Sequence, residues 1–127
     1  RKTFIPIKKN WLTIWKKRMP KKNIRNDAEN LVVKNNQLIS IGGKIKKKFP
    51  QFQFMGLMKI VNKDFLIMEK FFREINNTKI DFTSFLDLIV KNNKLNISCV
   101  KTNKFWFEID TIKDLVIAKK IMRGDML

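Results

Sequence analysis

The sequence predicts an α/β fold in which helices flank a mixed sheet. Segments rich in β-branched and aromatic residues alternate along the chain with segments whose apolar residues recur at helical spacing. Two short apolar runs, 29–33 and 37–41, flank Lys34-Asn35-Asn36, which is typical of a β-hairpin with asparagines at its turn. With 127 residues, of which 44% are hydrophobic, the chain is long enough for one domain with its own core.

Before the hairpin we expect one strand and one helix. Residues 3–7 form the predicted strand, and Pro6 indicates that this strand lies at a sheet edge or at a bulge. Asn10 is the expected cap of a short helix over 11–18. We interpret the basic segment 16–26 as a loop.

After the hairpin, Gly42-Gly43 is expected to end that unit. Residues 52–61 predict a central strand interrupted by Gly56, and a glycine at such a position marks a bulge or a close backbone approach. The spacing of apolar residues then predicts an amphipathic helix over 63–75.

A second helix, over about 82–92, is expected to begin at Asp81 or Thr83 as its cap. A strand over 95–100 follows, and it contains Cys99, which we interpret as a buried structural thiol. The chain has one cysteine, so it has no intramolecular disulfide, and this is typical of a reducing cytoplasm. We therefore expect a cytoplasmic protein.

The segment FWFEID (105–110) predicts a further strand, because aromatic and β-branched residues favour one. Alternate side chains of a strand point to opposite faces. The two expected faces consist of Phe105, Phe107 and Ile109 on the buried side, and Trp106, Glu108 and Asp110 on the other. An indole beside two carboxylates makes a poor core but a plausible site wall.

The last predicted helix starts at Ile112, with Thr111 as N-cap and Asp114 at the third helical position, where an acid suits the helix dipole. The preceding acids therefore lie at the carboxyl end of a strand, the edge where open α/β sheets bind ligands. The alternative is that these are solvated acids at a strand end, because one Glu-x-Asp is a weak motif.

The composition excludes several chemistries. The chain has no histidine, which excludes a Ser-His-Asp triad, a Cys-His pair and His-ligated zinc. Any metal is then a hard cation on oxygen ligands. No apolar run approaches the roughly 18 residues of a membrane span, so we expect no membrane partner.

The formal net charge of +17 has two interpretations. Basic clusters at 16–22 and 43–48 are typical of nucleic-acid binding, and Trp11 and Trp15 could stack on bases. However, the excess is mostly lysine, with abundant asparagine and isoleucine, as AT-rich coding would produce for any function. Arginine is the preferred residue for bidentate contacts to bases and phosphates, and it is scarce here, so we do not expect a nucleic-acid partner.

Six motifs occur in order between Asn10 and Ile121: W-x3-W-K-K-R, D-A-E, I-G-G-K, F-M-G-L-M-K, D-F-T-S-F-L and W-F-E-I-D-T-x-x-D-L. Their order and spacing resemble the C-terminal half of bacterial nucleotidyltransferases, especially choline-phosphate cytidylyltransferases and the related domains found with phosphoenolpyruvate mutase. The resemblance implies the C-terminal half of a Rossmann-like nucleotidyltransferase fold. Residues 1–127 would then form a partial domain that binds the acceptor.

The family's nucleotide-binding N-terminal half supplies a glycine-rich basic loop and a first metal-binding aspartate, and nothing in this sequence matches either. The chain also begins at Arg1 rather than Met. We therefore expect a fragment without transferase activity of its own, with an apolar sheet face or strand edge left uncovered.

The resemblance implies a reaction in which a phosphate or phosphonate oxygen attacks the α-phosphorus of a nucleoside triphosphate, CTP being favoured, and pyrophosphate leaves. It assigns Asp110 to Mg²⁺, a cation that prefers oxygen ligands. It assigns Lys44 to the acceptor phosphate, although lysines are abundant in this chain. The small phosphorylated acceptor would be choline phosphate or a similar aminoalkyl compound, with a hexose 1-phosphate as an alternative.

The remaining assignments concern the acceptor pocket. Trp106 and Glu108 would bind a cationic head group, which is favourable over an indole face. Asp81 would assist, or would only cap its helix. Asp27 and Glu29 match the family's D-A-E, or form a salt bridge at the entry to a strand. A further backbone contact is implied for Gly56.

Overall fold

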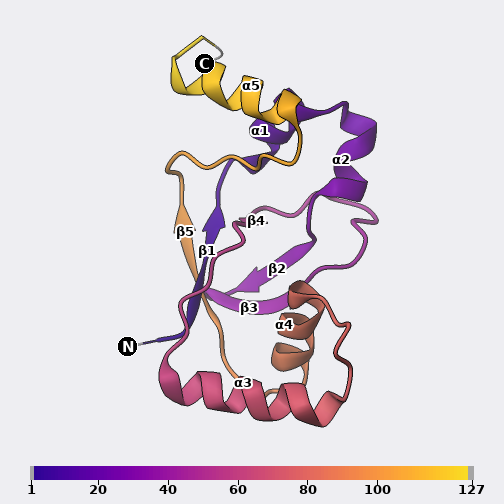
Figure 1. The fold of residues 1–127 in the computed structure, drawn as a ribbon, viewed down its shortest axis with the longest axis vertical. Coiled ribbons are helices and arrows are strands. Elements are labelled where there is room, and N and C mark those ends of the chain that lie inside the picture. The colour runs from indigo at the N-terminus through magenta and orange to yellow at the C-terminus, as the bar shows by residue number, and fades with distance from the viewer. Residues whose placement is uncertain (1, 126–127) are drawn as a thin grey trace.

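The computed structural model describes residues 2–125, which form a five-stranded sheet with five helices (Figure 1). The strand order is β2-β3-β5-β1-β4. The strands are β1 (Phe4–Lys8), β2 (Leu31–Lys34), β3 (Gln37–Ile41), β4 (Gln53–Phe54) and β5 (Ser98–Thr102). Strands β1 and β5 are parallel, and the other pairs are antiparallel, which confirms the predicted α/β class with a mixed sheet.

The helices gather at the two ends of the sheet. They are α1 (Trp11–Arg18), α2 (Lys21–Asp27), α3 (Asn62–Ile75), α4 (Phe82–Lys91) and α5 (Ile112–Met122). Helices α1, α2 and α5 lie at one end, where α1 contacts both of the others, and α3 and α4 pack together at the opposite end (Figure 1). No helix among residues 2–125 has the length and apolar composition needed to cross a membrane.

The hairpin of β2 and β3 forms as predicted. Asn35 and Asn36 have φ values of 51° and 58°, and this left-handed pair is what a two-residue type I′ turn requires. Asparagine adopts this conformation more readily than other residues with a side chain. The local sequence therefore determines the turn, and the turn sets the register of the adjoining pairs up to Val33 and Leu38, beyond which an irregularity shifts it by one residue.

Pro6 lies in a strand with neighbours on both sides, so its expected place at a sheet edge is wrong and the bulge alternative fits. Phe4 and Lys59 exchange two backbone hydrogen bonds of 2.9 Å, and pairing resumes only at Ile7 and Phe54. Alternate residues of a strand direct their backbone groups to the same side, so the ring nitrogen of Pro6 points to the side on which Phe4 pairs with Lys59. On that side, the segment between Phe54 and Lys59 leaves the ladder. No hydrogen bond is lost there.

Two further expectations are wrong in extent. The central strand predicted over 52–61 is only β4, two residues at the sheet edge, because Gly56 turns the chain away with φ of 73°.

The loop predicted over 16–26 is the end of α1 followed by α2. Pro20 precedes the first turn of α2, and a single buried side chain, Ile24, attaches this otherwise polar helix.

The main core lies between the sheet and helices α3 and α4. It consists of apolar side chains that include the fully buried Ile5, Ile7, Leu86, Ile89 and Ile97. Cys99 belongs to this core, and burial raises the pKa of its thiol to about 11, so it is the structural thiol that we expected. A second, smaller cluster surrounds α1 and consists of Trp11, Trp15, Ile24, Ala28 and Ile45.

Candidate functional site

An arginine lies at the centre of the candidate site. Arg18 is the last residue of α1, and its side chain is only 1% exposed. The helix buries Trp11, Trp15 and Arg18 on one side, at the spacing expected for a helical face. The guanidinium lies 4.9 Å from the centre of the Trp15 ring and 5.9 Å from that of Phe107. Aromatic side chains thus fix its position.

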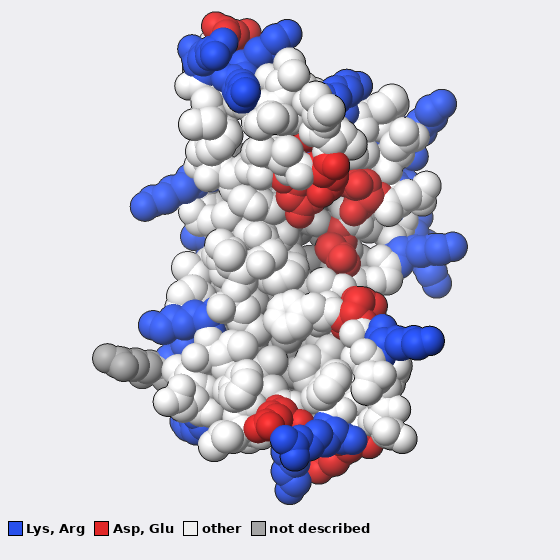
Figure 2. All heavy atoms as spheres, viewed as in Figure 1, with Lys and Arg blue, Asp and Glu red and all other residues white. Residues whose placement is uncertain are grey.

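Four carboxylates converge on this one guanidinium. The distances from its nitrogens are 2.9 Å to Asp110, 3.1 Å to Asp114, 3.4 Å to Asp27 and 3.6 Å to Glu108. The acids come from three places in the chain: the end of α2, the segment before α5, and the first turn of α5. Figure 2 shows acidic side chains gathered on the upper part of one face, while lysines and arginines project around the outline.

Asp114 anchors the cluster from α5. Thr111 is the N-cap and Asp114 the third helical residue, as the sequence predicted, and the two form a reciprocal capping box. Asp114 also accepts the hydrogen bond from Arg18 Nε. Desolvation by burial acts to raise the pKa of Asp114, but hydrogen bonds from Arg18 and Thr111 outweigh it, so the pKa lies below its ordinary value of 3.8. Asp114 is therefore an ionised structural partner of the guanidinium.

The other acids are compensated only in part, because they share the same guanidinium. Desolvation raises the pKa of Glu108, and Arg18 opposes the rise, while Asp110, Asp27 and Glu29 add to it by repulsion. Desolvation also raises the pKa of Glu29. One guanidinium thus faces a larger number of carboxylates, so this region is locally negative in a chain with an excess of positive charge. Such a region favours a cation.

Trp106 forms an aromatic wall next to these acids. Its ring lies 5.3 Å from the ring of Trp15, and Trp15 Nε1 donates a hydrogen bond of 2.9 Å to Asp27. Trp106 is half-buried. Part of the indole therefore packs on α1, and part remains accessible, in the same segment that carries Glu108 and Asp110.

The predicted strand over 105–110 is wrong, because residues 103–111 form neither helix nor strand. Phe105 and Ile109, expected on a buried face, are 56% and 52% exposed. The chain takes this path because the side chains of the other face have stronger partners: Trp106 packs on Trp15, and the two acids bind Arg18. Trp106, Glu108 and Asp110 all contact the end of α1, but Phe107, expected on the opposite face, also lies against Arg18, so the predicted division into two faces does not hold.

Asp81 has the capping role among its two predicted alternatives. It accepts hydrogen bonds from Ser84 N, Ser84 Oγ and Thr83 Oγ1, and these bonds lower its pKa to about 2. Thr83 Oγ1 also lies 3.4 Å from Glu29 Oε1. Asp81 therefore adjoins the acidic cluster through Thr83 and Glu29.

Of the D-A-E pair, Asp27 forms a salt bridge with Arg18, whereas Glu29 hydrogen-bonds to Thr83.

Lys44 and Gly56 are not brought into contact with the cluster. Both are exposed, and the Lys44 ammonium makes no hydrogen bond or ion pair with residues 2–125. A Cβ placed on Gly56 would meet nothing within 4 Å, so its positive φ of 73° explains the glycine without a ligand. Both assignments remain predictions.

Sequence reasoning missed the ion pair between Arg18 and Asp114, which lies at the centre of the site. Their separation of 96 residues leaves no local pattern. The available signal was the scarcity of arginine, since one of the few arginines stands three residues after the second of two tryptophans spaced by four.

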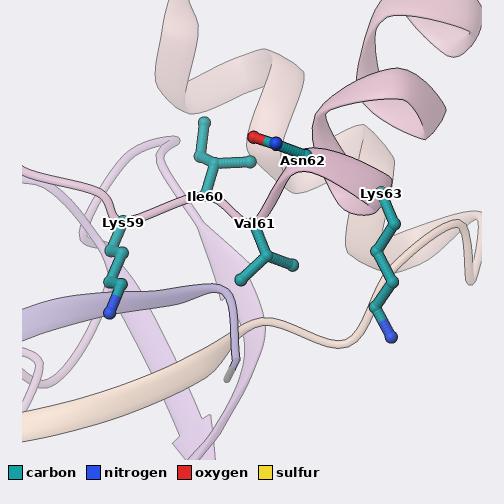
Figure 3. A pocket seen from close by; sticks show the side chains of 5 residues that line it. All are labelled: Lys59, Ile60, Val61, Asn62 and Lys63. Carbon is teal, nitrogen blue, oxygen red and sulfur yellow. The ribbon is translucent and has the colours of Figure 1, made fainter.

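A pocket of about 380 Å³ lies elsewhere, where the chain passes from its contact with β1 into α3 (Figure 3). Figure 3 shows Lys59 and Lys63 on either side of Val61, with Ile60 pointing away from them. The residues that line it include no acid or aromatic side chain. It has none of the chemistry of the Arg18 cluster.

Within residues 2–125, no three acidic, histidine or cysteine side chains are arranged to hold a metal ion. Asp110 is a possible single ligand. Its side chain is 63% exposed, with Oδ2 on Arg18 and no protein hydrogen bond to its other oxygen. Mg²⁺ commonly takes one or two carboxylates and completes its shell with phosphate and water, so the donor set fits one protein ligand.

Comparison with known proteins found no family model and no curated protein that matches the chain, so the site is interpreted from its geometry.

Proposed function

We propose that this chain is the acceptor-binding part of a Mg²⁺-dependent nucleotidyltransferase that joins a nucleoside monophosphate to a small phosphorylated compound with a cationic head, such as choline phosphate. The observation that carries the proposal is the convergence of Asp27, Glu29, Glu108 and Asp110 beside Trp106. The resemblance described above selects the same residues. Their gathering from distant parts of the chain supports it independently.

Excess negative charge determines the kind of ligand. After Arg18 has formed its ion pairs, Glu108 still experiences repulsion from Asp110, Asp27 and Glu29. A quaternary ammonium group would relieve that repulsion and would also be attracted to an indole face. An anionic or neutral head group would do neither.

The reaction itself needs no side-chain base, because the attacking phosphate oxygen is already ionised. Mg²⁺, when bound, would offset the charge of the meeting phosphates. Asp110 would supply one ligand oxygen, and Arg18 would hold that carboxylate in place through its 2.9 Å contact. CTP remains the favoured nucleotide, on the resemblance alone.

The nucleic-acid alternative loses one of its supports. Trp11 and Trp15 are 2% and 1% exposed, so their rings are not available to stack on bases. The basic clusters at 16–22 and 43–48 remain its support in the sequence.

The test compares choline phosphate with 3,3-dimethylbutyl phosphate, which has the same shape but no positive charge, by calorimetric titration of the chain. We expect choline phosphate to bind at least about tenfold more tightly, since one cation–π contact with a nearby carboxylate contributes on the order of 1–2 kcal/mol. Equal affinity for the two compounds, or binding of neither, would contradict the proposal.

A matched pair of variants localises the effect. Glu108→Gln removes a charge from the site, and Glu69→Gln removes a charge from α3, where Glu69 pairs only with Arg73. Both variants change the net charge equally. We expect only Glu108→Gln to weaken binding of choline phosphate, and an equal loss in both variants would indicate a nonspecific charge effect.

A further inference from the structure

Lys8 is a buried lysine without an acidic partner. It is the last residue of β1, is 5% exposed, and burial lowers its pKa from the ordinary 10.5. Its ammonium donates hydrogen bonds of 2.9 Å to the carbonyl oxygens of Asn103 and Lys104, and one of 3.3 Å to Asn103 Oδ1. All three acceptors are neutral. Moving the ammonium charge of Lys8 out of water is costly when all its partners are neutral, so its burial requires an explanation.

The acceptors lie at the start of the segment that carries the site. Lys8 is paired with Thr102 in the parallel register of β1 and β5, and the chain leaves the sheet directly after Thr102. The irregular segment 103–111 then carries Trp106, Glu108 and Asp110 to Arg18. Its far end is fixed by Arg18 and by the capping box of α5.

Just before the segment, Lys9 N donates a backbone hydrogen bond of 2.9 Å to Thr102 O, which completes the pairing of the strands. The other contacts of residues 103 and 104 themselves are weak. Asn10 Nδ2 lies 3.5 Å from Asn103 Oδ1, and Lys104 N donates to Thr102 Oγ1 at 3.2 Å. Neither contact is buried. Hydrogen bonds from a charged donor are stronger than neutral ones, so Lys8 dominates the attachment.

We propose that Lys8 is a positioning residue for the candidate site, which fixes where the segment 103–111 leaves the sheet and thereby sets Trp106 and Glu108 against the ligand. The role in ligand binding rests on the proposed function. The attachment itself does not, because it follows from the contacts of Lys8 alone. Lys8 fixes one end of the segment as Arg18 fixes the other.

The test uses Lys8→Met, which keeps the length and apolar stem of the side chain and removes the ammonium. Lys9→Met is the matched control, because Lys9 is the exposed neighbour and its loss changes the net charge equally. Hydrogen exchange of residues 103–111, thermal unfolding and titration with choline phosphate are measured on the wild type and both variants.

In Lys8→Met we expect exchange at 103–111 to become about tenfold faster or more, since the lost bonds come from a charged donor. Affinity for choline phosphate should fall about tenfold, because the segment must then be ordered on binding. The unfolding midpoint should stay or rise, since methionine removes a desolvated charge.

Lys9→Met should match the wild type in exchange, affinity and unfolding midpoint. Lys8→Arg, which retains charge and donors, should recover part of the protection.

Unchanged exchange at 103–111 in Lys8→Met would overturn the attachment. Failure of this variant to fold, or faster exchange throughout the molecule, would show a general structural role and would overturn positioning. Faster exchange without loss of affinity would overturn the role in binding. If the wild type does not bind choline phosphate, the proposed function fails, and the exchange measurements still decide whether Lys8 holds the segment.

Discussion

Leu86 and Arg18 are both almost completely removed from solvent, but they hold together opposite ends of the molecule by different forces. Leu86 lies in the apolar core between the sheet and helices α3 and α4, where burial of apolar area stabilises the fold. Arg18 lies among α1, α2 and α5, where directional ion pairs to four carboxylates do so. The end at α3 and α4 depends on apolar volume and pattern, whereas the Arg18 end combines a smaller apolar cluster around α1 with one particular charged side chain.

The comparison of the two ends indicates which of them is suited to binding a ligand. An apolar core tolerates changes that conserve volume, and it has no chemistry to offer a ligand. The Arg18 end has more carboxylates than guanidinium groups, and Glu108 is repelled there by its acidic neighbours. Specific binding and lower stability are thus expected at the same end of the molecule.

Arg18→Met is expected to have the largest effect. It leaves the buried Asp114 without its guanidinium, and removing one partner of a buried ion pair costs about 3–5 kcal/mol. The loss should be confined to one end, so hydrogen exchange should rise in α1, α2 and α5 while α3 and α4 keep their protection. Uniform loss of protection would show that the two ends are not separable.

Leu86→Ala should have the next largest effect, about 3 kcal/mol in the free energy of unfolding, because it leaves a cavity at a site with no exposure. Urea unfolding measures it. In contrast to Glu108→Gln, it should leave the affinity for choline phosphate unchanged in the folded protein. A change in affinity as large as that of Glu108→Gln would contradict the division between the two ends.

Asp81→Ala should have the smallest effect, about 1 kcal/mol at pH 7, because it removes the N-cap of α4. The pKa of Asp81 is lowered to about 2 in the folded state, so its contribution is complete above its ordinary pKa of 3.8 and is lost as the pH falls toward 2. Urea unfolding of wild type and variant at several pH values should therefore show a difference that shrinks below about pH 4. A difference independent of pH would show that the charge of Asp81 is not involved.

Much of the apolar end could be predicted from the sequence, and little of the polar end. The spacing of apolar residues predicts α3 and α4, and the asparagine pair predicts the hairpin turn, because these patterns are local. The segment 105–110 was misread as a strand because local propensity favours one, while its path is determined by Arg18 and Trp15, about 90 residues away. The residue types of the candidate site were visible in the sequence, and its organising arginine was not.

The pairing of β1 with β5 has a consequence for how the chain can fold. The parallel strands β1 and β5 lie far apart in the sequence, with Phe4 beside Ser98 and Lys8 beside Thr102. During synthesis β1 must therefore remain unpaired on that side until β5 has emerged, and contacts of such long range slow folding. The α3–α4 pair and the hairpin can form early from local contacts. The ion pairs of Arg18 with Asp110 and Asp114 should be among the last contacts to form, which makes the candidate site a late event on the folding pathway.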